Sequence, residues 1–371
     1  MISFRCFLPT VTRDMADNQK SLFLQQIFKS SLLENTDFSK ISELLQQPRK
    51  ILITSHTNPD GDAIGASLGL FGYFKKKNHS VKVMIPDPDP GFLHWMPYHE
   101  NLMVYSQNKD LCIEAIQNAE IIFSVDYNGL KRLSHASEEV RKSKALKVLV
   151  DHHTQPDNDF DLMISIINTS STSELIYDFI VASGDSQLID KDIAECIYAG
   201  IITDTGSFSY SCNYEKTYLT TAALYRTGID GEHIHRLVYD TYSENRLRLL
   251  GFSISEKLVV LNEFNAAYIS LSLEELERFN HQIGDTEDVV NFALSIKDIN
   301  LAALFTERED LVKVSLRSKG NFPVNQIAKK YFNGGGHCNA AGANCYISLE
   351  ETIRIFLQML PLYKHELKSV Y

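Results

Sequence analysis

The sequence predicts an α/β protein in which an N-terminal domain, with a mostly parallel sheet flanked by helices, is joined by a helical connector to a smaller α+β domain. Three observations lead to this prediction. Short apolar runs alternate with helical patterns in the first half, strand patterns start again near residue 257, and the 371 residues suit two domains. The expected divisions are a tail at 1–20, a first domain at 21–235, the connector at 236–256 and a second domain at 257–371.

The first half of the chain reads as buried strands separated by crossover helices, an arrangement typical of parallel sheets. Runs rich in apolar and β-branched residues predict strands at 51–56, 81–86, 121–127, 146–152 and 163–168. Apolar residues at helical spacing predict helices at 63–76, 171–184 and 190–204. Ser171 and Glu174 have the spacing of a capping box at the start of the second of these helices.

The remaining elements follow a charged helical stretch. Residues 232–256 contain no proline and predict a helical connector between the domains, with a further surface helix of the first domain as the alternative. Beyond it, a helical piece at 273–279 lies among further strand patterns. These strands are expected at 257–261, 266–272, 301–307 and 311–318, and they indicate an α+β domain.

Composition and charge disfavour several classes of protein. The 36 Lys and Arg residues against 47 Asp and Glu give a net charge of −11, which argues against coating of long nucleic acids. The six cysteines are scattered without a CxxC pair, so neither a disulfide framework nor a structural zinc site is expected. No apolar run reaches the roughly 18 residues of a membrane helix, and the first residues lack a signal-peptide pattern. We therefore expect a cytoplasmic protein with reduced thiols, with Met15 as an alternative start.

The strongest local signal is the stretch HTNPDGD, which directly follows the strand residues 51–55. It holds three side chains that can bind a metal ion, and its Asn-Pro and Gly residues favour a tight turn. The three are His56, Asp60 and Asp62. Ligand sites form where parallel strands end, because the chain opens into a crevice there. Taken alone, the stretch could instead be a polar turn that caps the following helix.

Two other predicted strands end in carboxylates and imidazoles, which are Asp126 on one and Asp151, His152 and His153 on the other. Because the carboxyl ends of parallel strands meet at one edge of a sheet, these side chains and the turn at 56–62 are expected to gather there. Asp204 ends an apolar helical pattern, where a lone carboxylate needs a partner. Clustered carboxylates repel one another, and cations relieve that repulsion. The alternative for the whole set is a collection of helix caps and turn aspartates.

The ligand types indicate which metal to expect. Oxygen and imidazole ligands without thiolates suit Mn²⁺ or Mg²⁺, with Co²⁺ or Fe²⁺ as further candidates, and argue against structural zinc. Six such side chains are too many for one ion that also holds water. They fit two ions that share a carboxylate and lie about 3.5–4 Å apart. Such a pair would let a phosphate bind despite the acidic total charge.

Four ordered motifs resemble those of the DHH phosphoesterase superfamily. In this sequence they are SHTNPDGDAIGA (55–66), VDYNGLKRL (125–133), VDHH (150–153) and GIITDTGSF (200–208). The segments LRS (316–318) and NGGGHCNAAGA (333–343) are similar to the family's associated C-terminal domain. Within the superfamily, the chain is most similar to the bifunctional nanoRNases (oligoribonucleases) and pAp phosphatases. The resemblance implies a phosphoesterase with two Mn²⁺ ions that uses activated water to hydrolyse short RNAs and the 3′-phosphate of adenosine 3′,5′-bisphosphate (pAp).

The resemblance also implies a role for each residue of the cluster. The ligands of one Mn²⁺ would be His56, Asp60 and Asp126. Those of the second would be Asp62, Asp126, His152 and Asp204, so that Asp126 bridges the two ions. His153 matches a catalytic histidine that contacts the substrate phosphate, and Asp151 would orient its neighbours as a hydrogen-bond acceptor.

The second domain carries candidate substrate-binding residues. Successive glycines let backbone N–H groups approach an anion, and the histidine after them could stack on a base or bind a phosphate. These residues are Gly334, Gly335, Gly336 and His337, and the alternative is a flexible glycine turn with a surface histidine. Arg317 is a candidate phosphate clamp, with a surface ion pair as the alternative, and Ser318 is a weaker candidate.

Two rival functions remain open from the sequence. The first is a phosphodiesterase of the same superfamily that hydrolyses cyclic di-AMP or pApA, because the metal site and the anion clamp would be shared. The second, of another class, is a catalytically idle nucleotide-binding sensor, although every ligand position holds a suitable side chain. The expected partners are short RNAs or nucleoside bisphosphates, without long duplex nucleic acid or membrane. The resemblance is also compatible with a homodimer.

Overall fold

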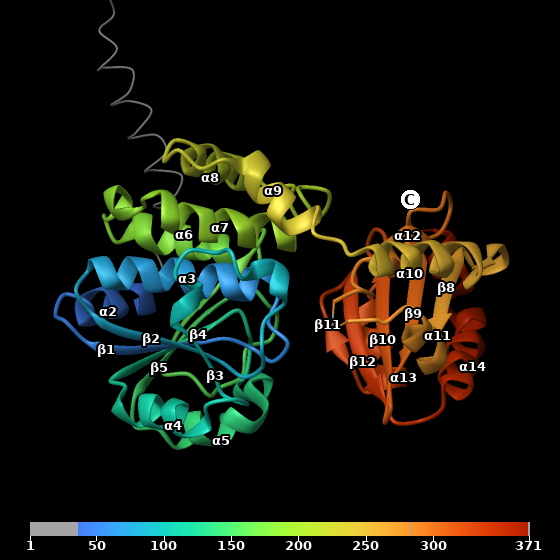
Figure 1. Cartoon of the computed structure of the whole chain (residues 1–371), viewed down its shortest axis with the longest axis horizontal. Helices are drawn as coiled ribbons and strands as arrows, with labels where there is room; N and C mark the ends of the chain where they lie inside the picture. Colours follow the sequence, from blue (N-terminus) through green and yellow to red (C-terminus); the bar gives the residue numbers. More distant parts are fainter. Residues whose placement is uncertain (1–35, 283, 370–371) are drawn as a thin grey trace, which may run out of the picture. The chain divides into compact units, whose positions relative to one another are not determined.

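A computed structural model describes residues 36–282 and 284–369 of the chain. The chain divides into two compact units, Met1–Asp240 and Thr241–Tyr371, which are described one at a time (Figure 1). The expected tail at 1–20 and the alternative start at Met15 lie outside the described residues.

The first unit is built on a parallel six-stranded sheet in the order β3-β2-β1-β4-β5-β6. The strands are β1 (Lys50–Thr54), β2 (Ser80–Ile85), β3 (Leu102–Val104), β4 (Ile121–Val125), β5 (Leu146–Asp151) and β6 (Leu162–Ser165). The chain builds outward from β1 through β2 to β3, then returns to β4 on the other side of β1. Such a reversal of strand order leaves a crevice at the carboxyl ends of the two central strands. The predicted parallel sheet is confirmed.

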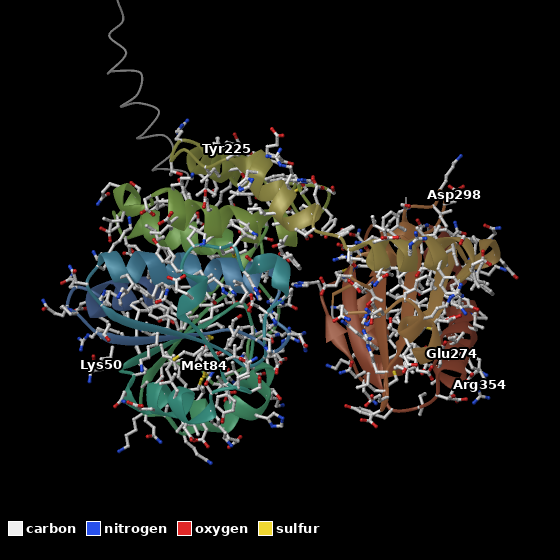
Figure 2. The ribbon with its side chains drawn as sticks, in the orientation of Figure 1. Lys50, Met84, Tyr225, Glu274, Asp298 and Arg354 are labelled. Carbon is white, nitrogen blue, oxygen red and sulfur yellow. The ribbon has the colours of Figure 1, made fainter. Side chains whose placement is uncertain are left out.

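Helices cover both faces of this sheet (Figure 1). One face packs against α2 (Thr36–Leu44), α3 (Gly61–Lys76), α6 (Thr172–Ala182) and α7 (Lys191–Asp204). The other packs against α4 (Lys109–Asn118), η3 (Leu130–Ala136) and α5 (Ser137–Lys142), where the fully buried Met84 is labelled in Figure 2. Because both faces are covered, the strands read as continuous apolar runs in the sequence. The remaining elements of the unit are η1 (Gly91–Leu93), η2 (His99–Asn101), η4 (Ser186–Leu188), α8 (Glu215–Tyr225) and α9 (Gly231–Tyr239).

Side-chain caps fix where the central helices begin. Asp60 caps α3 through its Oδ1 atom, which accepts from the backbone N–H groups of Asp62 and Ala63. The hydroxyl of Ser171 caps α6 by accepting from the N–H of Glu174. The predicted capping box forms only in part, because the Glu174 carboxylate accepts from Ser170 and from the Thr217 hydroxyl instead.

Helices α3 and α7 approach each other closely at glycines. A Cβ atom at Gly65 would lie 2.5 Å from the carbonyl oxygen of Cys196, and one at Gly61 would lie 2.4 Å from the Thr203 side chain. Only hydrogen fits at these two positions of α3 without moving the neighbouring helix. The contact places the N-terminus of α3, which follows the predicted turn at 56–62, beside the C-terminal part of α7.

The second unit holds a six-stranded mixed sheet in the order β11-β12-β10-β9-β8-β7, with only the β8–β9 pair parallel. Its strands are β7 (Leu258–Leu261), β8 (Ala266–Leu271), β9 (Leu301–Glu307), β10 (Val312–Ser318), β11 (Gly335–Gly336) and β12 (Ala340–Cys345). Side chains alternate along β9 between two apolar cores, one with Phe305 and the other with Leu304. The expected second α+β sheet domain is confirmed.

Helices of the second unit cover the two faces of its sheet (Figure 1). One core includes residues of α13 (Val324–Phe332), α14 (Leu349–Met359), η6 (Leu360–Tyr363) and α15 (Lys364–Lys368), and the other those of α10 (Glu244–Ser255), α11 (Leu273–Arg278) and α12 (Val289–Leu294). A short turn, η5 (Asn262–Phe264), joins β7 to β8. Within the described ranges, no helix combines the length and apolar character that crossing a bilayer requires.

Candidate metal centre

The predicted cluster lies at the carboxyl ends of three neighbouring strands of the first unit. His56 follows β1, Asp126 follows β4 directly, and the Asp151-His152-His153 run ends β5. The strands pair in the order β1-β4-β5, so these side chains share one edge of the sheet. All but His153 are buried, with relative exposures of 9% or less. Asp204, the last residue of α7, joins them from the helical layer.

Besides Asp126, Asp151 and His153, two further groups of these side chains have ligand atoms within 4.8 Å of one another. One group is His56, Asp60 and Asp126, and the other is Asp62, His152 and Asp204. Asp126 faces both: its Oδ2 lies 3.5 Å from Nε2 of His56, and its Oδ1 lies 3.6 Å from Nε2 of His152. One carboxylate is therefore placed where it could be shared by two ions.

The turn at 56–62 both caps a helix and contributes to the candidate metal centre. Asp60 caps α3 with Oδ1 and also contributes a ligand atom to the first group. The backbone N–H of Asn58 donates to Asp87, and that of Thr57 donates to the carbonyl oxygen of Arg132, at 2.8 Å. Arg132 therefore holds the turn through its main chain. The helix cap and its neighbours fix the carboxylates in place before any ion binds.

The histidine rings are oriented by hydrogen bonds from their Nδ1 atoms. Nδ1 of His56 lies 2.8 Å from the carbonyl oxygen of Thr57, which can only accept. The proton therefore sits on Nδ1, and the Nε2 lone pair is left for a metal ion. Nδ1 of His153 lies 2.7 Å from Oδ1 of Asp151, which is fully buried and orients this ring.

Hydroxyl and amide groups at the start of α6 also belong to this centre, although no motif in the sequence predicted them. The N–H groups of Thr172 and Ser173 donate to the two oxygens of Asp62 at 2.7 and 2.8 Å. The Thr172 hydroxyl donates to Oδ1 of Asp126 at 2.8 Å. The run TSSTS at 169–173, which is polar but buried and leads into an apolar helix, is the signal that could have revealed them.

The electrostatics show a surplus of negative charge. Burial, followed by the carboxylates of Asp62 and Asp60, raises the pKa of Asp126 well above its ordinary value. Burial likewise raises the pKa of Asp204 to about 8, although His152 opposes that shift. The pKa of His152 lies near 9 because the surrounding carboxylates, Asp204 first, outweigh its burial. Oδ2 of Asp151 is buried without a hydrogen-bond partner. This donor set fits divalent cations, which would neutralise the carboxylates.

Asp126 adopts an uncommon backbone conformation, with φ at 65°. Its N–H donates to the carbonyl oxygen of Val150 on β5, which ties the residue to the neighbouring strand. Left-handed backbone at a non-glycine residue stores strain, and such residues gather at functional sites. Aspartate tolerates this conformation better than most residues, so the strand can end in an abrupt turn that aims the carboxylate into the crevice.

The candidate substrate-binding residues gather at one end of the sheet in the second unit. Arg317 and Ser318 end β10, and Arg317 pairs across the sheet with Ala340 of β12. Gly335 and Gly336 form β11, which pairs with β12, and His337 begins the turn between these two strands. The sheet therefore brings together residues that are about twenty positions apart in the sequence.

The structure gives some of these residues a packing role as well. A Cβ atom at Gly334 would lie 2.1 Å from the carbonyl oxygen of Gly342, and one at Gly336 would lie 2.5 Å from that of Ala340. Only Gly335 has open space on that side. Ser318 is buried, and its hydroxyl donates to the carbonyl oxygen of Phe322 and accepts from Asn339. These hydrogen bonds suit a residue that supports the loop containing Phe322.

Comparisons with known proteins give the same two-part organisation. Residues 50–201 match the family model described as "DHH family, N-terminal domain", and residues 265–360 match the DHHA1 domain. The chain is 30% identical over 321 residues to the bifunctional oligoribonuclease and PAP phosphatase NrnA of Bacillus subtilis, covering 85% of this chain and 96% of that one. It is 23% identical to the cyclic-di-AMP phosphodiesterase PdeA of Listeria monocytogenes, covering 87% of this chain and 49% of that one.

A solved structure is similar along nearly the whole chain. It is the crystal structure of an exopolyphosphatase-related protein from Bacteroides fragilis, which matches with a TM-score of 0.87 and 40% sequence identity. The match covers 90% of this chain and 98% of that one, so both units are shared.

Proposed function

The chain belongs to the DHH family and is a hydrolase acting on phosphoester bonds, and on that premise we propose that it is a Mn²⁺-dependent enzyme that degrades very short RNAs and removes the 3′-phosphate of pAp. We place this activity in the cytoplasm. The observation that carries the proposal is the position of Asp126, whose two oxygens face two separate groups of ligand atoms. Two divalent ions in such a site polarise a phosphate and activate water.

The residues of the first unit have three roles in this proposal: they bind the ions, position the ligands and contact the phosphate. We assign His56, Asp60 and Asp126 to one ion, and Asp62, Asp126, His152 and Asp204 to the other. The Thr172 hydroxyl and the N–H groups at the start of α6 hold Asp126 and Asp62 in place. Asp151 fixes the ring of His153 through Nδ1, and the protonated imidazole can then donate from Nε2 to a phosphate oxygen and stabilise the charge that develops there.

The second unit supplies the groups for the rest of the nucleotide. Arg317 presents a guanidinium, which suits bidentate binding of a phosphate. The neighbouring strand pair with Gly335, Gly336 and His337 offers exposed backbone and an imidazole at the same end of that sheet. The net charge of −11 gives a long polyanion little additional affinity, which favours substrates of very few nucleotides.

A substrate panel tests this proposal directly. With Mn²⁺ present, we expect pApA, a trinucleotide RNA and pAp to be hydrolysed faster than cyclic di-AMP or a 24-nucleotide RNA. Treatment with a chelator should abolish all activity, and Mn²⁺ should restore more of it than Mg²⁺. Products separated by chromatography give the rates. The similarity to the Listeria phosphodiesterase favours cyclic di-AMP as the alternative substrate. Turnover of cyclic di-AMP far above that of pApA and pAp would replace our assignment with that one.

Replacing Arg317 with glutamine tests the second unit. We expect KM for pAp to rise about 10–100-fold with a smaller change in kcat, because a hydrogen bond to a charged group contributes about 1.5–3 kcal/mol. The matched control is Lys313→Gln, an exposed cation on the same strand β10. Steady-state kinetics with saturating Mn²⁺ provide both constants. An unchanged KM in the Arg317 variant would remove this residue from substrate binding.

A further inference from the structure

A further group of ligand-type side chains lies between β2 and β3, and the centre described above uses none of it. Asp89, His94 and His99 each place one ligand atom within 4.8 Å of the others. The Asp89 side chain is 6% exposed, and each of its oxygens faces an imidazole. Oδ2 lies 2.9 Å from Nε2 of His99, and Oδ1 lies 3.8 Å from Nε2 of His94.

The backbone around these residues is anchored to the core. Leu93, directly before His94, and Met96, two residues after it, are 0% and 2% exposed. The rings of His94 and His99 lie against each other, with centroids 4.6 Å apart and planes tilted by 40°. The two imidazoles thus lie beside the same carboxylate, and buried residues on either side of His94 anchor its backbone.

The spacing suits a metal ion. Zinc ligands lie about 2.0–2.2 Å from the ion, so two ligand atoms of a tetrahedral site are about 3.4 Å apart. The observed separations of 2.9 and 3.8 Å lie on either side of that value. The His94 side chain is 57% exposed, which leaves a route for the ion and room for a water molecule as fourth ligand.

We propose that Asp89, His94 and His99 bind one Zn²⁺ ion, a site additional to the pair of ions at the carboxyl ends of the strands. Two imidazoles and one carboxylate favour late first-row metals such as Zn²⁺ and Ni²⁺ over Mn²⁺ and Mg²⁺, which prefer oxygen ligands. The ion would replace the hydrogen bond between Asp89 and His99 with three coordinate bonds. It would thereby stiffen a segment whose Asp87 accepts from the N–H of Asn58 in the turn at 56–62.

The sequence contains a built-in reporter for this site. Trp95 is the only tryptophan of the chain, and it directly follows His94. Ni²⁺ has unpaired d electrons and quenches the fluorescence of a nearby indole, whereas Zn²⁺ has a filled d shell and does not quench in this way. Emission from Trp95 therefore reports Ni²⁺ at His94, and Zn²⁺ competes for the same ligands.

The experiment titrates NiCl₂ into the full chain after removal of bound metals and saturation with Mn²⁺. We expect saturable quenching of Trp95 at one Ni²⁺ per chain, and prior addition of Zn²⁺ should prevent it. His94→Gln/His99→Gln should raise the apparent Kd for Ni²⁺ by about 100-fold or more, since even outer contacts of a metal site are worth 10–100-fold. The control His135→Gln, an exposed histidine of the same unit, should behave as the unchanged protein.

The quenching results distinguish a zinc site at these residues from its absence. Absence of saturable quenching in the unchanged chain, or equal quenching in the double variant, would overturn the proposal. If the double variant fails to fold by circular dichroism, His94→Gln alone serves, because the exposed His94 side chain is tolerant of replacement. Hydrolysis of pApA with Mn²⁺ should persist in that variant, so failure of the zinc site is distinguishable from failure of the proposed function.

Discussion

Replacing Asp126 with asparagine is expected to lower kcat/KM for pApA by at least about 10³-fold, because loss of a single preorganised electrostatic group at a reacting centre already costs about 10²–10³-fold. Asp126 faces both groups of ligand atoms, so the substitution removes a negative charge from two proposed ion sites at once. No other carboxylate of the centre occupies that shared position among the described residues.

The same substitution should leave the fold intact. Asparagine keeps an oxygen that can accept from the Thr172 hydroxyl, and it tolerates the left-handed backbone that Asp126 adopts at φ 65°. Burial and the neighbouring carboxylates raise the pKa of Asp126, so removal of its charge relieves repulsion in the metal-free protein. We expect the metal-free Tm to stay the same or rise, while the increase in Tm on adding Mn²⁺ becomes smaller.

Kinetics at saturating Mn²⁺ and thermal unfolding with and without Mn²⁺ provide the two measurements. Asp192→Asn is the matched control, since Asp192 is an exposed carboxylate in the first turn of α7, the helix that ends at Asp204. It should change neither quantity. Activity of the Asp126 variant within a few fold of the unchanged enzyme would mean that no shared carboxylate is needed, and the two-ion assignment would have to be abandoned.

The candidate centre was predictable to the extent that it depends on strand ends. Parallel strands with both faces covered give continuous apolar runs, and whatever follows such runs lies at one edge of the sheet. The strand ends alone therefore predict that His56, Asp126 and His152 lie together, without knowledge of the helices. The strand ends could not reveal Thr172 and Ser173, because the bonds of these two residues to Asp62 depend on how α6 packs beside the start of α3.

Several elements were not predicted, and each has a physical reason. Strand β3 has only three half-buried residues and pairs with β2 alone at the edge of the sheet, so its pattern carries little information. Strands β11 and β12 are rich in glycine and alanine, which lack strand propensity. Their pairing depends on close backbone approach at Gly334 and Gly336, a tertiary contact that a local pattern cannot contain.

Buried charge away from the candidate centre gives the largest expected effect on stability. Glu174 and Asp178 lie one turn apart on α6, with exposures of 0% and 1%. Lys216 of α8 bonds to the Asp178 carboxylate, and its Nζ lies 3.8 Å from Oε1 of Glu174. The hydroxyl of Thr217 donates to the other oxygen of Glu174 at 2.8 Å. The ammonium group of Lys216 therefore compensates the negative charge of two buried carboxylates.

Replacing Lys216 with methionine should lower the free energy of unfolding by about 3–5 kcal/mol near pH 8, since removal of one partner leaves a buried charge uncompensated. Lys191→Met is the control, because the Lys191 side chain is exposed and its ion pair with Glu195 four residues on in the helix should contribute no more than about 0.5 kcal/mol. Adding Asp178→Leu to the Lys216 variant should restore part of the loss, because it removes the orphaned carboxyl. Urea unfolding of the three variants and the unchanged protein measures these differences.

The pH dependence provides a stricter test of the same cluster. Burial raises the pKa of Asp178 to about 7 in the folded protein, above its ordinary value of 3.8, so the folded state holds this proton more tightly than the unfolded state. The contribution of Asp178 to stability is therefore fully present below about pH 4 and is lost as the pH rises towards 7. Lys216 lowers the pKa of Asp178, so its removal extends that loss to higher pH. The effect of Lys216→Met should thus be smaller at pH 5 than at pH 8, and an equal effect at both values would contradict a cluster governed by the charge of Asp178.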